Sequence, residues 1–199
     1  MTNINALTLE VPDISAAEVF YDKAFGLGDR LRFRAAEAPS QGFRAFVISL
    51  VVADPTVADS FLGPAIDAGA TVLKPAKKSF WGYGGVVQAP DGAIWKVASS
   101  SKKPAGAPAR TVDDLVLLLA VDDVAATKQF YADRGFMVGK SYGRKYVEFE
   151  SGPDAVKLAL YGRKAAAKDA AGSGSHRLVI AGDAGQFSDP DGFMWSADT

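Results

Sequence analysis

Few side chains in this sequence could carry out acid–base or metal chemistry, and His176 is the first of them. It is the only histidine, and imidazole is the side chain best suited to exchange protons near neutral pH. A histidine on a strand that faces a cavity could act as a general base. The alternative is a half-buried strand histidine that hydrogen-bonds within the fold. The chain has no cysteine, so thiolate nucleophiles, thiolate metal ligands and disulfides are excluded.

Glu10 is the second candidate for proton transfer. It shares a strand face with Ala6 and Thr8, because alternate residues of a strand point to the same side. If that face lines a cavity, the carboxylate could accept a proton or anchor a cationic ligand. The alternative is a glutamate at the end of a strand, in contact with water.

A run of aromatic residues and glycines predicts one wall of a pocket for a flat molecule. Lys96 could pair with a carboxylate or phosphate in such a pocket, or extend its long side chain to the rim without any role in binding. Ordinary core packing around a turn explains the aromatic run equally well. The aromatic residues are Phe80, Trp81 and Tyr83, and the glycines are Gly82, Gly84 and Gly85.

The elements that would position these residues are indicated by a repeat. The tripeptide Pro-Asp-Gly occurs at 90–92 and again at 190–192, followed by Trp95 and Trp195. Proline, aspartate and glycine in this order favour a tight turn, and the apolar runs on either side predict a hairpin corner. The repeating unit is β-α-β-β-β, used about four times, with the first and last copies abbreviated.

The sequence also predicts the positions of one helix and one strand. A helix is expected over 16–25, with Ser15 as N-cap and Glu18 completing a capping box, and a strand is expected over 176–180. Residues 99–110 read SSSKKPAGAPAR, which is linker composition. We therefore predict an N-terminal domain at 1–100, a linker at 101–110 and a C-terminal domain at 111–199.

With these motifs in view, the chain resembles the vicinal oxygen chelate superfamily: glyoxalase I, the extradiol dioxygenases and the bleomycin-resistance proteins. The resemblance implies an α+β fold of paired βαβββ modules, the glyoxalase/bleomycin resistance/dioxygenase fold, whose sheets curl around a cavity for metal and substrate or for ligand alone. Its points of likeness are LTLEVPD…FY…GL at 7–27, VVADPTVADSF…AGATVLKP…WGYGG…APDGAIW at 51–95, LLLAVDD…FY…GF at 117–136 and DPDGFMW at 189–195.

The resemblance also supplies a test for a metal site. Metal-using members of the superfamily place His, Gln or Glu on the first strand of each module and a carboxylate on the last. Of the corresponding residues here, only His176 is a good ligand, and a single histidine does not hold a catalytic divalent ion. We therefore expect no metal and no other cofactor. The corresponding residues are Ala6, Val47, Val116 and His176 on first strands, and Ala159, Lys96 and Ser196 on or near last strands.

The expected function is metal-independent binding of a small planar or aromatic molecule in an aromatic-lined cup, with Glu10, Lys96 or His176 orienting its polar end. One alternative is an enzyme of the glyoxalase, lyase, isomerase or dioxygenase type that uses His176 or Glu10 as base, or that binds metal through unconventional ligands. Another is a module whose cups are filled by its own side chains.

Composition limits the other partners. A net charge of −1 shows no excess of basic residues for nucleic acid. The N-terminus has neither the basic start nor the apolar run of a signal peptide, and no stretch has the apolar length of a membrane span. We expect a cytoplasmic protein with a small-molecule ligand, and a homodimer stays open.

Overall fold

A computed structural model describes residues 1–37, 42–106, 109–163 and 176–197 of the 199-residue chain. Its contacts group the chain into two compact units, each built from separate stretches of sequence. The first unit comprises residues 1–12, 29–46 and 117–199, and the second comprises residues 13–28 and 47–116. No helix within the described ranges is long and apolar enough to cross a membrane.

This grouping differs from the division predicted at 101–110, because the linker residues belong to the second unit. The physical reason is strand pairing. Strand β1 (Ile4–Val11) pairs with β11 (Leu178–Gly182), so the first residues of the chain join the last ones. Two consecutive domains at 1–100 and 111–199, joined by a linker at 101–110, stay a prediction.

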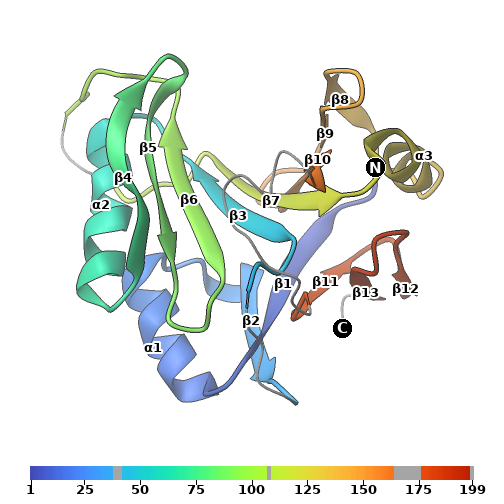
Figure 1. The fold of residues 1–199 in the computed structure, drawn as a ribbon, viewed down its shortest axis with the longest axis horizontal. Helices are drawn as coiled ribbons and strands as arrows, with labels where there is room; N and C mark the ends of the chain where they lie inside the picture. Colours follow the sequence, from blue (N-terminus) through green and yellow to red (C-terminus); the bar gives the residue numbers. More distant parts are fainter. Residues whose placement is uncertain (38–41, 107–108, 164–175, 198–199) are drawn as a thin grey trace. The chain divides into compact units, whose positions relative to one another are not determined.

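The first unit contains a five-stranded sheet in the order β12-β13-β11-β1-β2. In this sheet β1 runs antiparallel to β11 and parallel to β2, and β11 runs parallel to β13 (Figure 1). Besides β1 and β11, its strands are β2 (Leu31–Ala35), β12 (Phe187–Ser188) and β13 (Met194–Ala197). A 3₁₀ turn, η1 (Gly28–Arg30), precedes β2.

The rest of the first unit is formed by one helix and a second group of strands. Strands β10, β9 and β8 follow one another antiparallel, and α3 packs on β9 and β10. Strand β7 belongs to the second unit in its first residues and to the first unit from Leu117 onward. These elements are β7 (Asp114–Val121), α3 (Val124–Ala132), β8 (Val138–Ser141), β9 (Tyr146–Phe149) and β10 (Lys157–Gly162).

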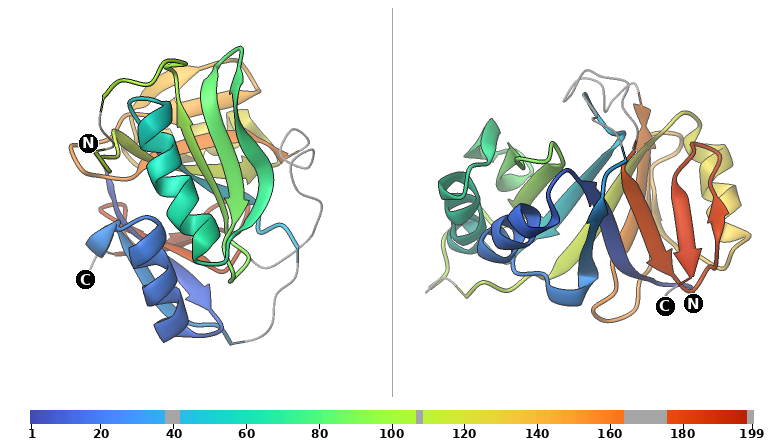
Figure 2. Two further views of the ribbon diagram at one scale, coloured as in Figure 1. Left: turned by 90° about the vertical axis from the view of Figure 1, so that its left-hand side faces the viewer. Right: turned by 90° about the horizontal axis from the view of Figure 1, so that it is seen from below.

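In the second unit four strands follow the order β4-β5-β6-β3, with α2 against one face (Figure 2). Helix α1 packs beside α2. The elements are α1 (Ile14–Ala24), β3 (Phe46–Val51), α2 (Pro55–Asp67), β4 (Thr71–Ser79), β5 (Gly82–Gln88) and β6 (Ile94–Ser99).

The predicted α+β architecture of repeated βαβββ modules is confirmed. The two complete copies are β3-α2-β4-β5-β6 and β7-α3-β8-β9-β10. The copy at each end is abbreviated: β1-α1-β2 at the start, and β11, β12 and β13 with no helix among residues 176–197 at the end.

Aspartates rather than serine begin the helices. Asp13, Asp54 and Asp123 are the N-caps of α1, α2 and α3, and each side chain accepts a backbone N–H of the first turn. The prediction of Ser15 as N-cap was wrong, because Asp13 already accepts the N–H of Ala16 at 2.9 Å.

Candidate functional site

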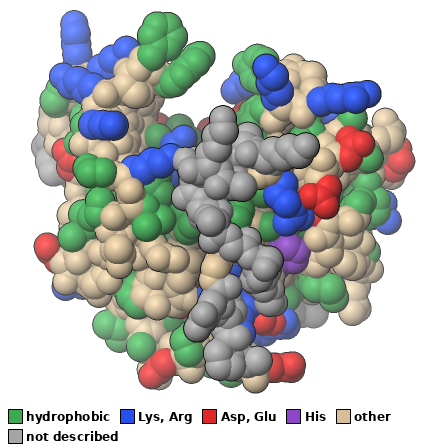
Figure 3. Space-filling view, viewed as in Figure 1, with side chains coloured by type: hydrophobic (Ala, Val, Ile, Leu, Met, Phe, Trp, Pro, Cys, Tyr) green, Lys and Arg blue, Asp and Glu red, His purple; other side chains and the backbone are tan. Residues whose placement is uncertain are grey.

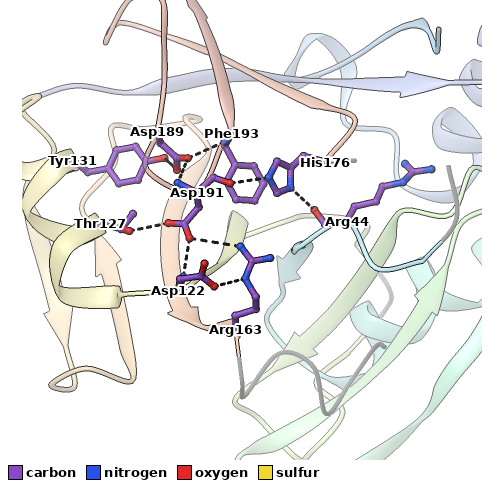
Figure 4. Close-up of polar contacts among 9 residues, drawn as sticks. All are labelled: Arg44, Asp122, Thr127, Tyr131, Arg163, His176, Asp189, Asp191 and Phe193. Carbon is purple, nitrogen blue, oxygen red and sulfur yellow. Dashed lines mark hydrogen bonds and ion pairs between the residues drawn. The ribbon is translucent and has the colours of Figure 1, made fainter. Parts of the chain in front are cut away.

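The structure places His176 just before β11, not on the strand as predicted. Its Nδ1 lies 2.9 Å from the carbonyl oxygen of Arg44 and its Nε2 lies 3.0 Å from that of Asp191 (Figure 4). The ring also stacks on Phe193, with 3.9 Å between centroids. Carbonyl oxygens only accept hydrogen bonds, so only an imidazolium with both nitrogens protonated makes both bonds at once. This geometry leaves no ring nitrogen directed at a ligand.

His176 lies against a corner built around Asp189. The hydroxyl of Tyr131 donates to Asp189 at 2.6 Å, and the backbone N–H of Phe193 donates at 2.8 Å (Figure 4). Burial raises the pKa of Asp189 above its ordinary value, whereas these hydrogen bonds act in the opposite direction. Burial, with the Asp189 charge beside it, raises the pKa of Tyr131 well above 10.0. Tyr131 and Asp189 therefore stabilise the turn, and the Asp189 carboxylate is not available as a free base.

Asp191, the second acid of the same corner, is also fully engaged. It accepts the backbone N–H of Asp122 at 2.7 Å and the hydroxyl of Thr127 at 2.9 Å. Arg163 lies 3.6 Å from it and donates to Asp122 at 2.6 Å. The carboxylate joins the corner to the start of α3 and is not positioned to act on a substrate.

The residues that correspond to the metal positions expected from the resemblance do not provide a ligand set. Ala6 and Val116 are buried apolar side chains, and the nitrogens of His176 are both within hydrogen-bond distance of carbonyl oxygens. Within the described ranges, no group of three or more His, Cys, Asp or Glu side chains could hold a metal ion. The chemistry of the donors present does not fit a catalytic divalent cation.

Glu10 does not point alone into a cavity. Arg34, its register partner on β2, donates to it through Nε at 3.0 Å and forms a further ion pair through Nη2. The Glu10 side chain is 22% exposed and that of Arg34 is 53% exposed. The Glu10 carboxylate is therefore engaged by a neighbouring strand of its own sheet.

Lys96 and Tyr83 were predicted to line one pocket, but the structure places them on opposite faces of the second unit's sheet. The Tyr83 hydroxyl donates at 2.7 Å to Asp59 of α2, so Tyr83 lies on the helix-covered face. Burial raises the pKa of Tyr83 to about 12, and the hydrogen bond to Asp59 adds to the shift. Lys96 is exposed and is paired in register with Val86, three positions from Tyr83 on β5.

We call the surface around Lys96 the Lys96 face. Lys96 is flanked in register by Ser49 on β3 and Val86 on β5, and the next pair on this face, Ala98 and Gly84, is small. A lysine beside a flat patch of small residues can pair with an acidic group while a planar ring lies on the patch. The Lys96 face consists of Gly84, Val86, Lys96 and Ala98, and the buried Ser49 lies beside Lys96 in register.

Phe80 and Trp81 lie together in the turn between β4 and β5. They are 82% and 84% exposed, and their rings meet edge to face with 5.1 Å between centroids. The Nζ atom of Lys102 lies 5.7 Å from the Phe80 ring centroid. Figure 3 shows hydrophobic side chains projecting at this end of the hairpin, with cationic side chains nearby. The pair is open to water and forms no wall with Tyr83.

The glycines of this hairpin have a structural explanation. A Cβ atom on Gly82 or Gly84 would collide with the carbonyl oxygens of Ser99 or Val97 on β6. Close approach of strand to strand, rather than of ligand to backbone, therefore accounts for these two residues.

A cavity of about 160 Å³ lies between α2, β4 and β5. Its lining is almost entirely apolar, and it is smaller than the ~300–1,000 Å³ that small-molecule pockets usually occupy. We therefore do not place a ligand in it. It is lined by Leu62, Ile66, Val72, Lys74, Pro75, Ala76 and Val87.

The sequence analysis missed two features of the first unit. One is the hydrogen-bonded corner at Asp189. Asp189 directly precedes the second Pro-Asp-Gly, whereas Ala89 precedes the first, and this difference between the two copies could have indicated the corner. The other is Arg177, a buried arginine directly after His176. An arginine in an apolar run is such a signal, because charged residues are almost never fully buried without a partner.

Comparisons with family models and with curated proteins find no match for the chain. Solved structures do match. Glyoxalase I from Zea mays superposes with a TM-score of 0.67 at 12% identity, over 98% of this chain and 91% of that one. A protein from Bacillus subtilis provisionally named a dioxygenase superposes with a TM-score of 0.59 at 12% identity, over 95% of this chain and 71% of that one. The chain therefore shares the fold of glyoxalase I.

Proposed function

We propose that this chain binds a small planar or aromatic molecule without the help of a metal ion. The observation that carries the proposal is the donor set. Where metal-using proteins of this fold place ligands, the chain has Ala6, Val47, Val116 and a His176 whose ring nitrogens both meet carbonyl oxygens. A site built this way can hold an organic molecule through side-chain contacts alone.

The Lys96 face, together with Phe80 and Trp81, is the proposed binding surface. Lys96 would pair with an acidic group, and an aromatic ring would stack on the exposed face of Trp81. Lys96 and Ser99 are separated by about 10 Å along β6, at roughly 3.3 Å per residue, and Ser99 pairs with Tyr83 next to the hairpin turn. A ligand that uses both anchors is therefore larger than a single ring.

Tyr83 is not part of this surface, since its hydroxyl is bonded to Asp59 on the other face. Catalysis with His176 or Glu10 as base has less support, because His176 is held by two carbonyl oxygens and Glu10 by Arg34. The cytoplasmic location and a homodimer stay predictions from the sequence.

Trp81 provides the test. It is 84% exposed, whereas Trp95 and Trp195 are 0% and 1% exposed, so a quencher bound at the surface acts on Trp81. We would titrate planar aromatic acids and their neutral amides, with and without a chelator, and follow tryptophan fluorescence and calorimetric heat. The proposal predicts saturable binding that the chelator does not change.

Two variants locate the site. Lys96→Gln should weaken the acids several-fold and leave the amides unchanged, because only the acids pair with the ammonium group. Trp81→Phe should abolish the quenching but keep calorimetric binding, since phenylalanine still stacks. A panel with no calorimetric binding, or binding lost on addition of the chelator, would refute the proposal.

A further inference from the structure

Arg177 is a largely buried arginine that has no counter-ion among the residues described by the structure. Its side chain is 8% exposed and its Nε atom has no hydrogen-bond partner. The guanidinium forms no hydrogen bond or ion pair with any residue that the structure describes. An arginine stays charged at every pH that a folded protein tolerates, so it cannot escape the cost of burial by losing its proton. A buried charge without a partner is strongly unfavourable.

Glu10 lies beside the Arg177 backbone but does not serve as its counter-ion. The carbonyl oxygen of Arg177 accepts the N–H of Glu10 at 3.0 Å, which places its backbone beside the end of β1. The carboxylate of Glu10 is already bonded to Arg34. No carboxylate of the described residues pairs with the Arg177 guanidinium, so this group can pair with an anion from solution.

The backbone of Arg177 adopts a conformation that is uncommon for arginine. Its φ of +49° lies in the left-handed region, which few residues other than glycine adopt. Such a conformation costs free energy and persists only where the surroundings maintain it. An arginine in this position is therefore not explained by backbone preference or by packing alone.

We infer that Arg177 binds an anionic group, a carboxylate or a phosphate, at a site in the first unit that is separate from the Lys96 face. The guanidinium offers five N–H donors in a planar fork, which fits two oxygens of either group. A bound anion would accept a hydrogen bond from the buried Nε atom and pair with the charge of the guanidinium. This inference goes beyond the proposed function and does not depend on it.

The test uses inorganic phosphate and acetate as probes on the full-length chain, with sodium chloride at matched ionic strength as the salt control. The melting temperature of the natural protein should rise saturably with phosphate or acetate, beyond the effect of chloride. Arg177→Met keeps the length of the side chain and removes its charge. It should show no such rise, and it should melt higher than the natural protein in buffer without these anions.

Arg134→Met is the matched control, because the Arg134 guanidinium stacks 3.6 Å from the Phe130 ring centroid. This variant should respond to phosphate as the natural protein does. An equal phosphate response in Arg177→Met, or no response in the natural protein, would overturn the inference. A larger response to acetate than to phosphate would identify a carboxylate ligand, and the reverse a phosphate.

If Arg177→Met does not fold, Arg177→Lys replaces it in the test, because this variant keeps the positive charge but loses the planar set of N–H donors. Phosphate binding to Arg177→Lys, measured by calorimetry, should be weaker by about tenfold, since a lysine pairs as a point charge. Unchanged affinity in Arg177→Lys would contradict a guanidinium site. Binding of aromatic acids at the Lys96 face is measured separately by Trp81 fluorescence. The experiments can therefore refute the anion site at Arg177 without refuting the proposed function, and the reverse.

Discussion

Tyr21 and Tyr131 make matching pairs of hydrogen bonds, but the acids that they contact differ in their access to water. Tyr131 donates to Asp189 and accepts the indole N–H of Trp195 at 3.2 Å. Tyr21 donates to Asp91 at 2.8 Å and accepts the indole N–H of Trp95 at 3.3 Å. Tyr131, Asp189 and Trp195 are all buried, whereas Asp91 is half-buried. The polar groups of the two sets therefore differ in their access to water.

Removal of the hydroxyl from each tyrosine tests this difference. Tyr131→Phe leaves the buried Asp189 carboxylate and the Trp195 N–H short of a partner, and should lower the free energy of unfolding by about 1–3 kcal/mol. Tyr21→Phe should cost less, because water can reach Asp91. Urea unfolding of both variants checks the order, and an equal or larger loss in Tyr21→Phe would contradict this account.

The raised pKa of Asp189 predicts a pH dependence of stability. Above its ordinary value of 3.8 and below its raised value, the folded state keeps a proton that the unfolded state has lost. The contribution of Asp189 to the free energy of unfolding is therefore largest below the unfolded pKa, and it is lost as the pH rises through the folded pKa. Asp189→Asn cannot titrate and should remove this component. Chemical unfolding at a series of pH values tests it, and identical pH profiles of variant and natural protein would disprove it.

At the scale of elements, the helix that begins at Asp54 depends most on its cap. Asp54 is 4% exposed and accepts the backbone N–H of Thr56 at 2.7 Å and of Val57 at 3.4 Å. Asp54→Ala leaves these donors without a partner and should lower the free energy of unfolding by about 1–2 kcal/mol. Asp54→Asn keeps the acceptor oxygen and should cost less. Thermal unfolding followed by circular dichroism compares the two, and equal losses would show that the carboxylate charge matters more than the cap.

Local patterns in the sequence were sufficient for the elements and the repeated corner. The Pro-Asp-Gly turns predict hairpin corners, and Trp95 and Trp195, which follow them, are buried. The N-cap of the first helix was missed because Ser15 and Asp13 both suit that role, and only the folded backbone distinguishes them. The strand predicted at 176–180 begins later, at Leu178, since the left-handed Arg177 interrupts the ladder.

The candidate site was less predictable, because side-chain roles depend on partners distant in sequence. Glu10 looked like a free carboxylate until strand pairing placed Arg34 beside it. Tyr83 and Lys96 looked like neighbours, but the alternation of side chains placed them on opposite faces. No local pattern indicates that His176 meets the carbonyl oxygens of Arg44 and Asp191.

At the scale of the whole molecule, the chain combines the glyoxalase fold with a residue set that does not suit metal chemistry. The pairing of β1 with β11 joins the two ends of the chain and cannot be read from a window of sequence, because it depends on contacts more than 150 residues apart. The repeat nevertheless predicted the modules, since the order of strands and helix recurs along the chain and the Pro-Asp-Gly corner occurs twice.

The most direct test of the central claim is the metal content of the protein, purified without chelators and then dialysed against Mn²⁺, Fe²⁺, Ni²⁺ or Zn²⁺. Because the first-strand positions carry Ala6, Val47, Val116 and a hydrogen-bonded His176, we expect well under one ion per chain and no change in His176→Ala. One tightly held transition-metal ion per chain, lost in His176→Ala, would contradict the account.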